Sequence, residues 1–276
     1  MNEVVSVDWL NKHIKDEKLI LLDASFPKIG GNESSELDNI TIPGARFFDL
    51  KCNFSDTSSP FPNTMPSEEQ FELESKKLGI NQDSKLIVFD NKGIYSSPRV
   101  WWMFKVMGHH KVSVLDGGLP EWIGKGFITC KRDIKNYEFG NFKAHLHAIF
   151  VKRYEDILNN IISETFTVVD ARSEGRFNGT EKEPRPLLKS GNIPNSVNIP
   201  FKEVLENGKF KSTSKLKKIF NAKCLDSKDL IFTCGSGLTA CIILLASELV
   251  YKKSRFVYDG SWTEWAEKQN LKEGEL

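Results

Sequence analysis

Cys234 is the residue of this chain best placed to act as a nucleophile. It follows the apolar run Leu230–Thr233, and two glycines come within the next three positions before a second apolar run, Cys241–Ala246. This pattern predicts a strand, a tight loop and a buried helix, with the cysteine at the first loop position. Loop N–H groups beside a helix N-terminus favour the thiolate, the reactive form of cysteine. A buried structural cysteine is the alternative, but a plain strand-to-helix turn rarely needs two glycines.

The residues after Cys234 suit an anion bound to its sulfur. A cysteine that accepts a sulfur atom becomes a persulfide anion, which needs several hydrogen-bond donors and little steric bulk around it. Gly235 and Gly237 let the backbone approach closely with its N–H groups turned inward. Ser236 and Thr239 add hydroxyl donors. The loop is therefore a candidate persulfide site.

Composition indicates an ordinary globular protein. The chain has 276 residues, of which 39% are hydrophobic and 27% charged, and its net charge is +1. No nucleic-acid partner and no membrane partner are expected from these values. The N-terminus lacks a signal-peptide pattern, so a cytoplasmic location is the expectation. The five cysteines are scattered and form no C-x-x-C pair, so neither a disulfide framework nor a metal site is expected. No cofactor is expected either.

An internal repeat organises the chain. Four blocks of the first half recur in the same order in the second half. The pairs are Leu21–Ser25 with Val168–Arg172, Ile42–Phe47 with Ile193–Asn198, Leu86–Asp90 with Leu230–Cys234, and Val114–Trp122 with Val257–Trp265. We therefore expect two homologous domains, 1–135 and 150–276, joined by a linker over 136–149.

Each half alternates short β-branched runs with helical segments, which predicts a mostly parallel sheet covered on both faces. Expected strands are 19–23, 86–89, 111–115, 167–170, 230–233 and 255–258, and expected helices are 7–14, 67–78, 97–107, 152–164 and 213–219. Ligands of such sheets bind beyond the carboxyl ends of the strands. Cys234 stands at such an end, and the repeat places Asp90 at the equivalent point of the first half. Since a carboxylate cannot perform thiol chemistry, we expect only the second half to be catalytic.

The segment Cys234–Ala240, C-G-S-G-L-T-A, resembles the active-site loop of the 3-mercaptopyruvate sulfurtransferases in the rhodanese superfamily. The resemblance covers nearly the whole chain. Asp90–Arg99 and Asp116–Leu119 resemble the non-catalytic domain of that family. The fold it implies is α/β, with two tandem rhodanese-like domains, each a mostly parallel sheet flanked by helices.

The same resemblance implies a substrate site. The segment Asp170–Arg185 is similar to a family segment in which two arginines hold the substrate carboxylate, and the matching residues are Arg176 and Arg185. Guanidinium groups pair bidentately with carboxylates, although surface ion pairs with nearby glutamates are the alternative role. Arg172 matches a structural position. The residues implied are catalytic Cys234 and Ser236, and substrate-binding Arg176, Arg185, Gly235, Gly237, Leu238 and Thr239.

The function implied is transfer of sulfur from 3-mercaptopyruvate through a Cys234 persulfide to a thiol acceptor or cyanide, with release of pyruvate. A thioredoxin-like protein is a candidate acceptor. Rhodaneses that act on thiosulfate, a dianion, carry basic residues after the cysteine, whereas Gly235 and Ser236 are neutral. Thiosulfate sulfurtransfer and a persulfide carrier or interaction module without turnover are the alternatives. A rhodanese-like phosphatase would need an arginine at Ala240. Thr41 stands where the family has a histidine before Ile-Pro-Gly-Ala.

Overall fold

The computed structural model describes residues 2–26, 36–133, 135–186, 188–223, 225, 228–251 and 256–270. The chain divides into two compact units. Unit 1 consists of Met1–Asp56, Met65–His147 and Asn207–Phe210. Unit 2 consists of Thr57–Thr64, Ala148–Glu206 and Lys211–Leu276.

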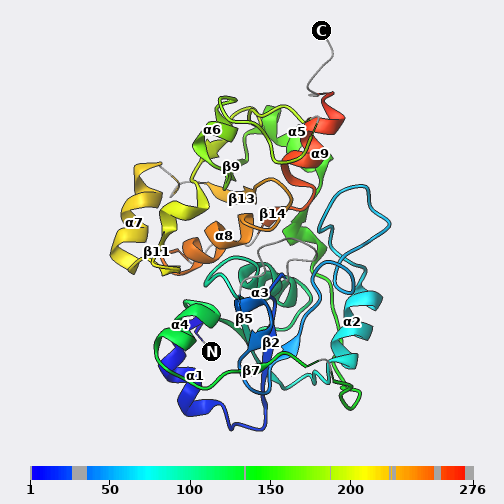
Figure 1. The fold of residues 1–276 in the computed structure, drawn as a ribbon. Coiled ribbons are helices and arrows are strands. Elements are labelled where there is room, and N and C mark those ends of the chain that lie inside the picture. The colour runs from blue at the N-terminus through cyan, green and yellow to red at the C-terminus, as the bar shows by residue number, and fades with distance from the viewer. Residues whose placement is uncertain are drawn as a thin grey trace. The chain divides into compact units, whose positions relative to one another are not determined.

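Unit 1 is built on a five-stranded parallel sheet with the strand order β1-β6-β5-β2-β4 (Figure 1). Its strands are β1 (Val4–Val5), β2 (Leu19–Asp23), β4 (Arg46–Phe47), β5 (Lys85–Phe89) and β6 (Val112–Leu115). Its helices are α1 (Val7–His13), η1 (Glu36–Asp38), α2 (Glu68–Lys77), α3 (Ser97–Val106) and α4 (Gly118–Gly124). The short strands β3 (Ile40–Thr41) and β7 (Cys130–Lys131) pair antiparallel, and β12 is Lys209–Phe210.

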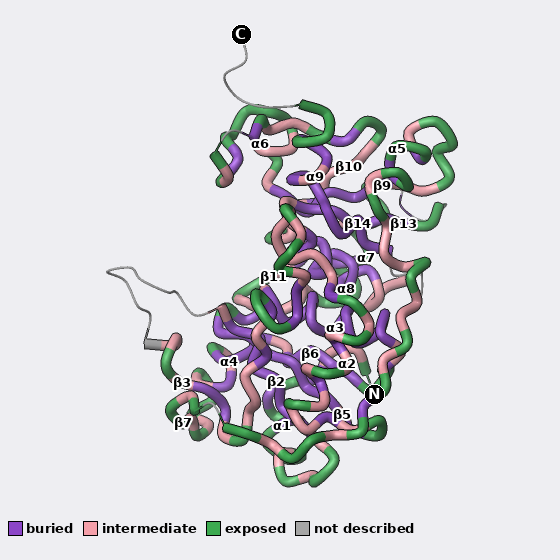
Figure 2. The backbone as a smooth tube through the Cα atoms, turned by 90° about the vertical axis from the view of Figure 1, so that its right-hand side faces the viewer, coloured by how far each residue is buried: buried purple, intermediate pink, exposed green. Residues whose placement is uncertain are grey.

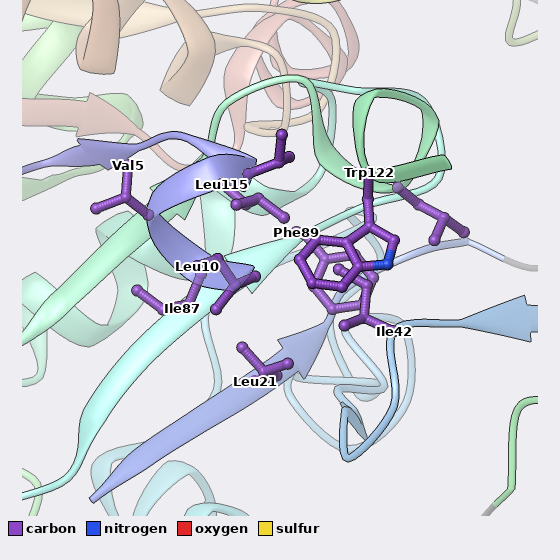
Figure 3. Close-up of a cluster of buried hydrophobic side chains, with 10 residues drawn as sticks. Val5, Leu10, Leu21, Ile42, Ile87, Phe89, Leu115 and Trp122 are labelled. Carbon is purple, nitrogen blue, oxygen red and sulfur yellow. The ribbon is translucent and has the colours of Figure 1, made fainter. Parts of the chain in front are cut away.

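Alternating side chains of the unit 1 strands build two cores. Leu21, Ile87 and Phe89 point to one face, where they pack with α1 and with Trp122 of α4. Figure 3 shows these side chains gathered around the Trp122 ring. Helix α3, which is entirely buried, packs against β5 and β6. Both faces of the sheet are therefore covered, as expected for parallel strands.

Unit 2 repeats this architecture in a sheet of order β10-β9-β13-β14-β8, again parallel throughout. Its strands are β8 (Val151–Lys152), β9 (Phe166–Asp170), β10 (Val197–Asn198), β11 (Leu205–Glu206), β13 (Asp229–Thr233) and β14 (Phe256–Tyr258). Its helices are η2 (Ala148–Phe150), α5 (Tyr154–Ser163), α6 (Glu174–Phe177), η3 (Phe201–Val204), α7 (Thr213–Ala222), α8 (Ala240–Glu248) and α9 (Ser261–Lys268). The strand orders correspond one to one, so each unit has the predicted α/β architecture.

The strand that leads to Cys234, β13, is packed in the core of unit 2. Ile231 of β13 packs with Trp262 and Trp265 of α9 and with Ile157 of α5. Helix α8 lies against β13 and is buried from Ala240 to Ser247. In Figure 2, β13, β14 and α8 are mostly purple, which marks them as buried. Because both neighbours of the loop between β13 and α8 are fixed by packing, the loop itself is held at both ends.

Most predicted elements are present, and the differences include the edges of both sheets. Lys152 was expected in a helix, but it lies in the edge strand β8 and pairs beside Tyr258 of β14, so α5 begins only at Tyr154. The edge strand β1 was not predicted. Two-residue strands are too short to show a period, so only the neighbouring strand reveals them. Position 255, the predicted start of β14, lies outside the described residues.

The predicted linker and domain boundaries stay a prediction, although part of this segment has clear contacts in unit 1. The Gly140 N–H donates to the carbonyl of Lys76 at 2.9 Å, and the Leu146 N–H donates to the carboxylate of Glu68 at 2.6 Å. Both acceptors belong to α2. In the part of the chain that the structure describes, no helix has the length and apolarity that crossing a membrane requires.

Candidate active site

Cys234 is the first residue after β13, and only 2% of its surface is exposed. The loop runs from Cys234 to Thr239, and α8 begins at Ala240. Gly237 has a φ of +74°, in the left-handed region that favours glycine. Gly235 leaves room for Arg176, because a Cβ there would lie 2.9 Å from the guanidinium Nη2 of that residue and would displace it. The two glycines therefore serve different purposes, one for backbone conformation and one for close approach.

Ser261 holds this loop in place through three hydrogen bonds. Its Oγ accepts hydrogen bonds from the N–H of Cys234 at 3.3 Å and of Gly237 at 2.9 Å, and it donates to the carbonyl of Tyr258 at 2.9 Å. Ser261 is fully buried and has a φ of +53°, which is costly for a residue with a side chain. Ser261 was not among the predicted site residues. Its signal was in the repeat, where the equivalent residue is Gly118, with a φ of +51°.

The residues after Ser261 also bind the loop. The Trp262 N–H donates to the Cys234 carbonyl at 2.9 Å. Thr263 donates to the Gly235 carbonyl from its N–H at 3.2 Å and from its hydroxyl at 2.6 Å. With these carbonyls turned toward α9, the remaining amides of the loop are free to face elsewhere.

Five backbone N–H groups between Gly235 and Ala240 have no hydrogen-bond acceptor among the described residues. They are the N–H groups of Gly235, Ser236, Leu238, Thr239 and Ala240. Leu238 itself is 7% exposed, so part of this loop is shielded from water. An array of unsatisfied N–H groups next to a helix N-terminus is a ready site for an anion.

The equivalent loop of unit 1 holds an anion of its own. The Asp90 carboxylate accepts N–H groups from Lys92 at 2.9 Å, Tyr95 at 2.8 Å, Ser96 at 3.1 Å and Ser97 at 3.0 Å, and the Ser97 hydroxyl at 2.7 Å. Asp90 is 1% exposed. The carboxylate is therefore buried with its charge satisfied almost entirely by backbone amides.

The repeat transfers this observation to unit 2. Three of the donors to Asp90 come two, five and six residues after it. The same spacing from Cys234 leads to the free amides of Ser236, Thr239 and Ala240. The second loop thus has counterparts of three of the four backbone donors of the first, while the fourth counterpart, the Cys241 N–H, donates to the Leu238 carbonyl at 3.2 Å. The second loop has a thiol where the first has the carboxylate.

Both predicted arginines reach this loop. A Cβ built on Gly235 would lie 2.9 Å from Nη2 of Arg176 and 3.8 Å from Nη1 of Arg185. Arg176 lies on α6, whose first turn is capped by the Ser173 hydroxyl. The structure therefore brings both guanidinium groups to the residue that follows Cys234.

Arg176 is held in place by Glu183, which the sequence analysis considered only as a surface partner. Its Nε and Nη2 donate to the two oxygens of Glu183 at 3.1 and 2.5 Å. The Glu183 side chain is only 1% exposed, so this ion pair is shielded from water on the carboxylate side. The pair uses one edge of the guanidinium and leaves Nη1 for another partner.

Arg172 is buried and structural, as the resemblance implies. It forms a bidentate pair with Asp170, donates to Glu183 at 2.7 Å, and stacks 4.1 Å above the Trp262 ring. Arg185 differs from both other arginines, since its guanidinium has no hydrogen-bond or ion-pair partner among the described residues. Arg185 is thus the cation at the loop with its full set of donors available.

Ser236 has a neighbour that the sequence analysis missed. The amide of Asn63, in the Thr57–Thr64 segment of unit 2, donates to the Ser236 hydroxyl at 3.0 Å and to its carbonyl at 3.2 Å. Thr41 instead donates to Asp23 within unit 1 at 2.7 Å. Only the folded chain could reveal Asn63, because 173 positions separate it from Ser236.

Removal of the Ser261 hydroxyl is expected to loosen the loop and slow catalysis. Ser261→Gly keeps the backbone conformation but leaves two buried N–H groups without an acceptor, so we expect kcat/KM to fall by roughly 10- to 100-fold. Steady-state kinetics and the pH profile of Cys234 alkylation would measure the effect. Ser247→Ala is the control, because it removes a buried hydroxyl of α8 that donates to the Leu244 carbonyl and does not contact the loop. Unchanged kinetics and alkylation in Ser261→Gly would contradict a role in positioning the loop.

Comparison with known proteins identifies the family of this chain. The rhodanese-like domain family matches residues 6–125 and again 154–268. The chain is 43% identical over 273 residues to mouse 3-mercaptopyruvate sulfurtransferase, covering 95% of this chain and 91% of that protein. It is 42% identical to rat thiosulfate sulfurtransferase over the same length, with the same coverage of both chains.

The solved structures include a similar protein from Escherichia coli, the 3-mercaptopyruvate sulfotransferase SseA. It superposes with a TM-score of 0.83 at 34% identity, covering 95% of this chain and 99% of that one. Two matches to one domain family, the repeated parallel sheets and similarity along almost the whole length lead to a single assignment. The chain belongs to the rhodanese family and consists of two rhodanese-like domains in tandem.

Proposed function

We propose that this protein is a sulfurtransferase that takes sulfur from 3-mercaptopyruvate, holds it as a persulfide on Cys234 and passes it to a thiol acceptor or cyanide. The observation that carries the proposal is the set of loop N–H groups next to Cys234 that have no acceptor among the described residues, three of which correspond to N–H groups that bind the Asp90 carboxylate in unit 1. Similarity to proteins named 3-mercaptopyruvate sulfurtransferase supports the choice of donor.

In the first half-reaction, the Cys234 thiolate attacks the sulfur of mercaptopyruvate. The S–S bond forms as the C–S bond breaks, and its electron pair passes to the departing carbon, which gains the proton of the substrate thiol and leaves as pyruvate. Arg185 binds the carboxylate through its free fork, and Arg176, whose Nη2 is the atom nearest Gly235, contributes an N–H that Glu183 does not use toward the carboxylate or ketone oxygen. The charge that develops on the outer sulfur is stabilised by the loop amides.

In the second half-reaction, the acceptor attacks the outer sulfur and Cys234 leaves as a thiolate. A thiol acceptor becomes a persulfide, and cyanide becomes thiocyanate. This is covalent catalysis with two half-reactions, so ping-pong kinetics are expected. A thioredoxin-like protein suits the role of acceptor because it offers a nucleophilic thiolate.

Ser236 supplies a directed hydroxyl donor. Because Asn63 already donates to its oxygen, the Ser236 proton is free to point to a different acceptor, and the persulfide or the substrate oxygen is the group we assign. An amide does not titrate near neutral pH, so Asn63 orients the hydroxyl without acting as a base.

The test is sulfur transfer with 3-mercaptopyruvate and thiosulfate side by side, read as kcat/KM for each donor. Preference for mercaptopyruvate is the expected result. Preference for thiosulfate would favour the second candidate, which the 42% identity to rat thiosulfate sulfurtransferase supports. Turnover of neither donor, with a persulfide still detected on Cys234 by mass spectrometry, would indicate a carrier. Small thiols, cyanide and a thioredoxin compared as acceptors would then define the second half-reaction.

A further inference from the structure

The charges around Gly235 nearly balance. Three guanidinium groups, those of Arg172, Arg176 and Arg185, stand with the carboxylates of Asp170 and Glu183. Three positive and two negative charges leave the cluster with a net charge of +1. The Cys234 thiolate adds a negative charge that every donor must approach.

Glu183 is the group that keeps the net positive charge of this cluster low. Its oxygens bind both Arg172 and Arg176, at 2.7 and 2.5 Å, and its side chain is 1% exposed. Arg172 has a second carboxylate in Asp170, whereas Glu183 is the only carboxylate paired with Arg176 among the described residues. The charge that Glu183 offsets is therefore mainly that of the substrate-facing arginine.

A cluster with this low positive charge suits a monoanionic donor better than a dianionic one. A 2-oxo acid thiol carries one negative charge, which Arg185 alone can balance, whereas thiosulfate carries two. The second charge of a dianion would have to be met by Arg176, whose positive charge is already offset by its ion pair with Glu183. Electrostatic mismatch of this kind discriminates between ligands more than it changes the affinity of the favoured one.

We propose that Glu183 is a specificity-determining residue that sets the preference for monoanionic over dianionic sulfur donors. The inference rests on the proposed function, since it concerns the donor site of that reaction. Glu183 touches the arginine rather than the donor, so it acts through Arg176. Its effect is thus a change in selectivity, which a merely structural role would not produce.

The experiment measures donor binding without turnover, in a Cys234→Ser background. Calorimetric titration with 3-mercaptopyruvate and with thiosulfate gives a Kd for each donor. Addition of Glu183→Gln keeps the shape of the side chain and removes its charge, so we expect the ratio of the two Kd values to move toward thiosulfate by roughly tenfold. Glu181→Gln is the matched control, because Glu181 is exposed and bonds to the Ser173 hydroxyl. It should leave the ratio unchanged.

An equal change in both Kd values, or no change, would overturn the role of Glu183 in selectivity. If circular dichroism shows that the Glu183 variant does not fold, anion binding to the Cys234→Ser protein still tests the charge argument. This protein is expected to bind pyruvate more tightly than sulfate, and tighter binding of sulfate would refute the charge argument. Failure of the proposed function is separate, since it appears as absence of turnover in the unmodified protein.

Discussion

Cys234→Ser is expected to abolish sulfur transfer, with a loss of roughly 10⁴-fold or more in kcat. A serine hydroxyl near neutral pH is not ionised, and its oxygen cannot form the persulfide on which both half-reactions depend. The fold should persist, because serine is nearly isosteric with cysteine and the loop is held by backbone hydrogen bonds to Ser261, Trp262 and Thr263. Turnover with 3-mercaptopyruvate and the mass of the protein after exposure to the donor would measure both effects.

Cys241→Ser is the matched control. Cys241 is also buried, lies on α8, and contacts the Gly237 carbonyl at 3.5 Å. We expect this variant to keep its turnover and to gain one sulfur atom on exposure to the donor. Activity that survives in Cys234→Ser, or a persulfide that disappears in Cys241→Ser, would assign the nucleophile to a different residue.

Arg185 substitutions are expected to have the second largest effect. Arg185→Met removes the one guanidinium at the loop that has no partner among the described residues. We expect kcat/KM for mercaptopyruvate to fall by roughly 100-fold, mainly through KM, since a bidentate pair with a carboxylate is lost. The fold should be unaffected because no other described charge depends on Arg185.

Arg185→Lys separates the carboxylate role from charge alone. Lysine keeps the positive charge but lacks the planar fork, so mercaptopyruvate should lose more kcat/KM than thiosulfate does. Lys182→Gln, at an exposed cation of the same segment, is the control. Equal losses for the two donors in Arg185→Lys would remove the carboxylate role. Arg176 is a poorer probe, because its removal would leave Glu183 as a buried charge with one partner fewer.

Much of this fold could be predicted because the same blocks of sequence occur in both halves of the chain. The paired blocks identified the central strands, and the position after β13 placed Cys234 at the carboxyl end of the sheet. Gly235 and Gly237 were recognisable because glycine has few reasons to occur twice in a short turn. None of the four edge strands was predicted, since two residues carry no period; β1 and β8, for example, pair with strands more than a hundred residues away.

The residues that support the site were harder to predict than those that form it. Ser261 and Asn63 act through contacts that appear only when distant segments meet, whereas Glu183 contacts arginines of its own segment, and all three residue types are common in loops. Ser261 could have been noticed as the position where one half of the repeat has glycine and the other has serine. Asn63 and Glu183 offered no comparable sign, because surface loops are rich in asparagine and glutamate.

The Asp90 loop also has a thermodynamic consequence. In unit 1 the anion is part of the chain, so its binding to the amides is complete as soon as the unit folds. The corresponding amides beside Cys234 have no acceptor among the described residues, and the persulfide is the anion that we assign to them. The outer sulfur is covalently bound and is therefore present in the unfolded chain as well, but its charge can accept these N–H groups only in the native state, and this difference raises the free energy of unfolding. Sulfur loading should therefore stabilise the second unit, and the resting enzyme is the less stable of the two forms through which each catalytic cycle passes.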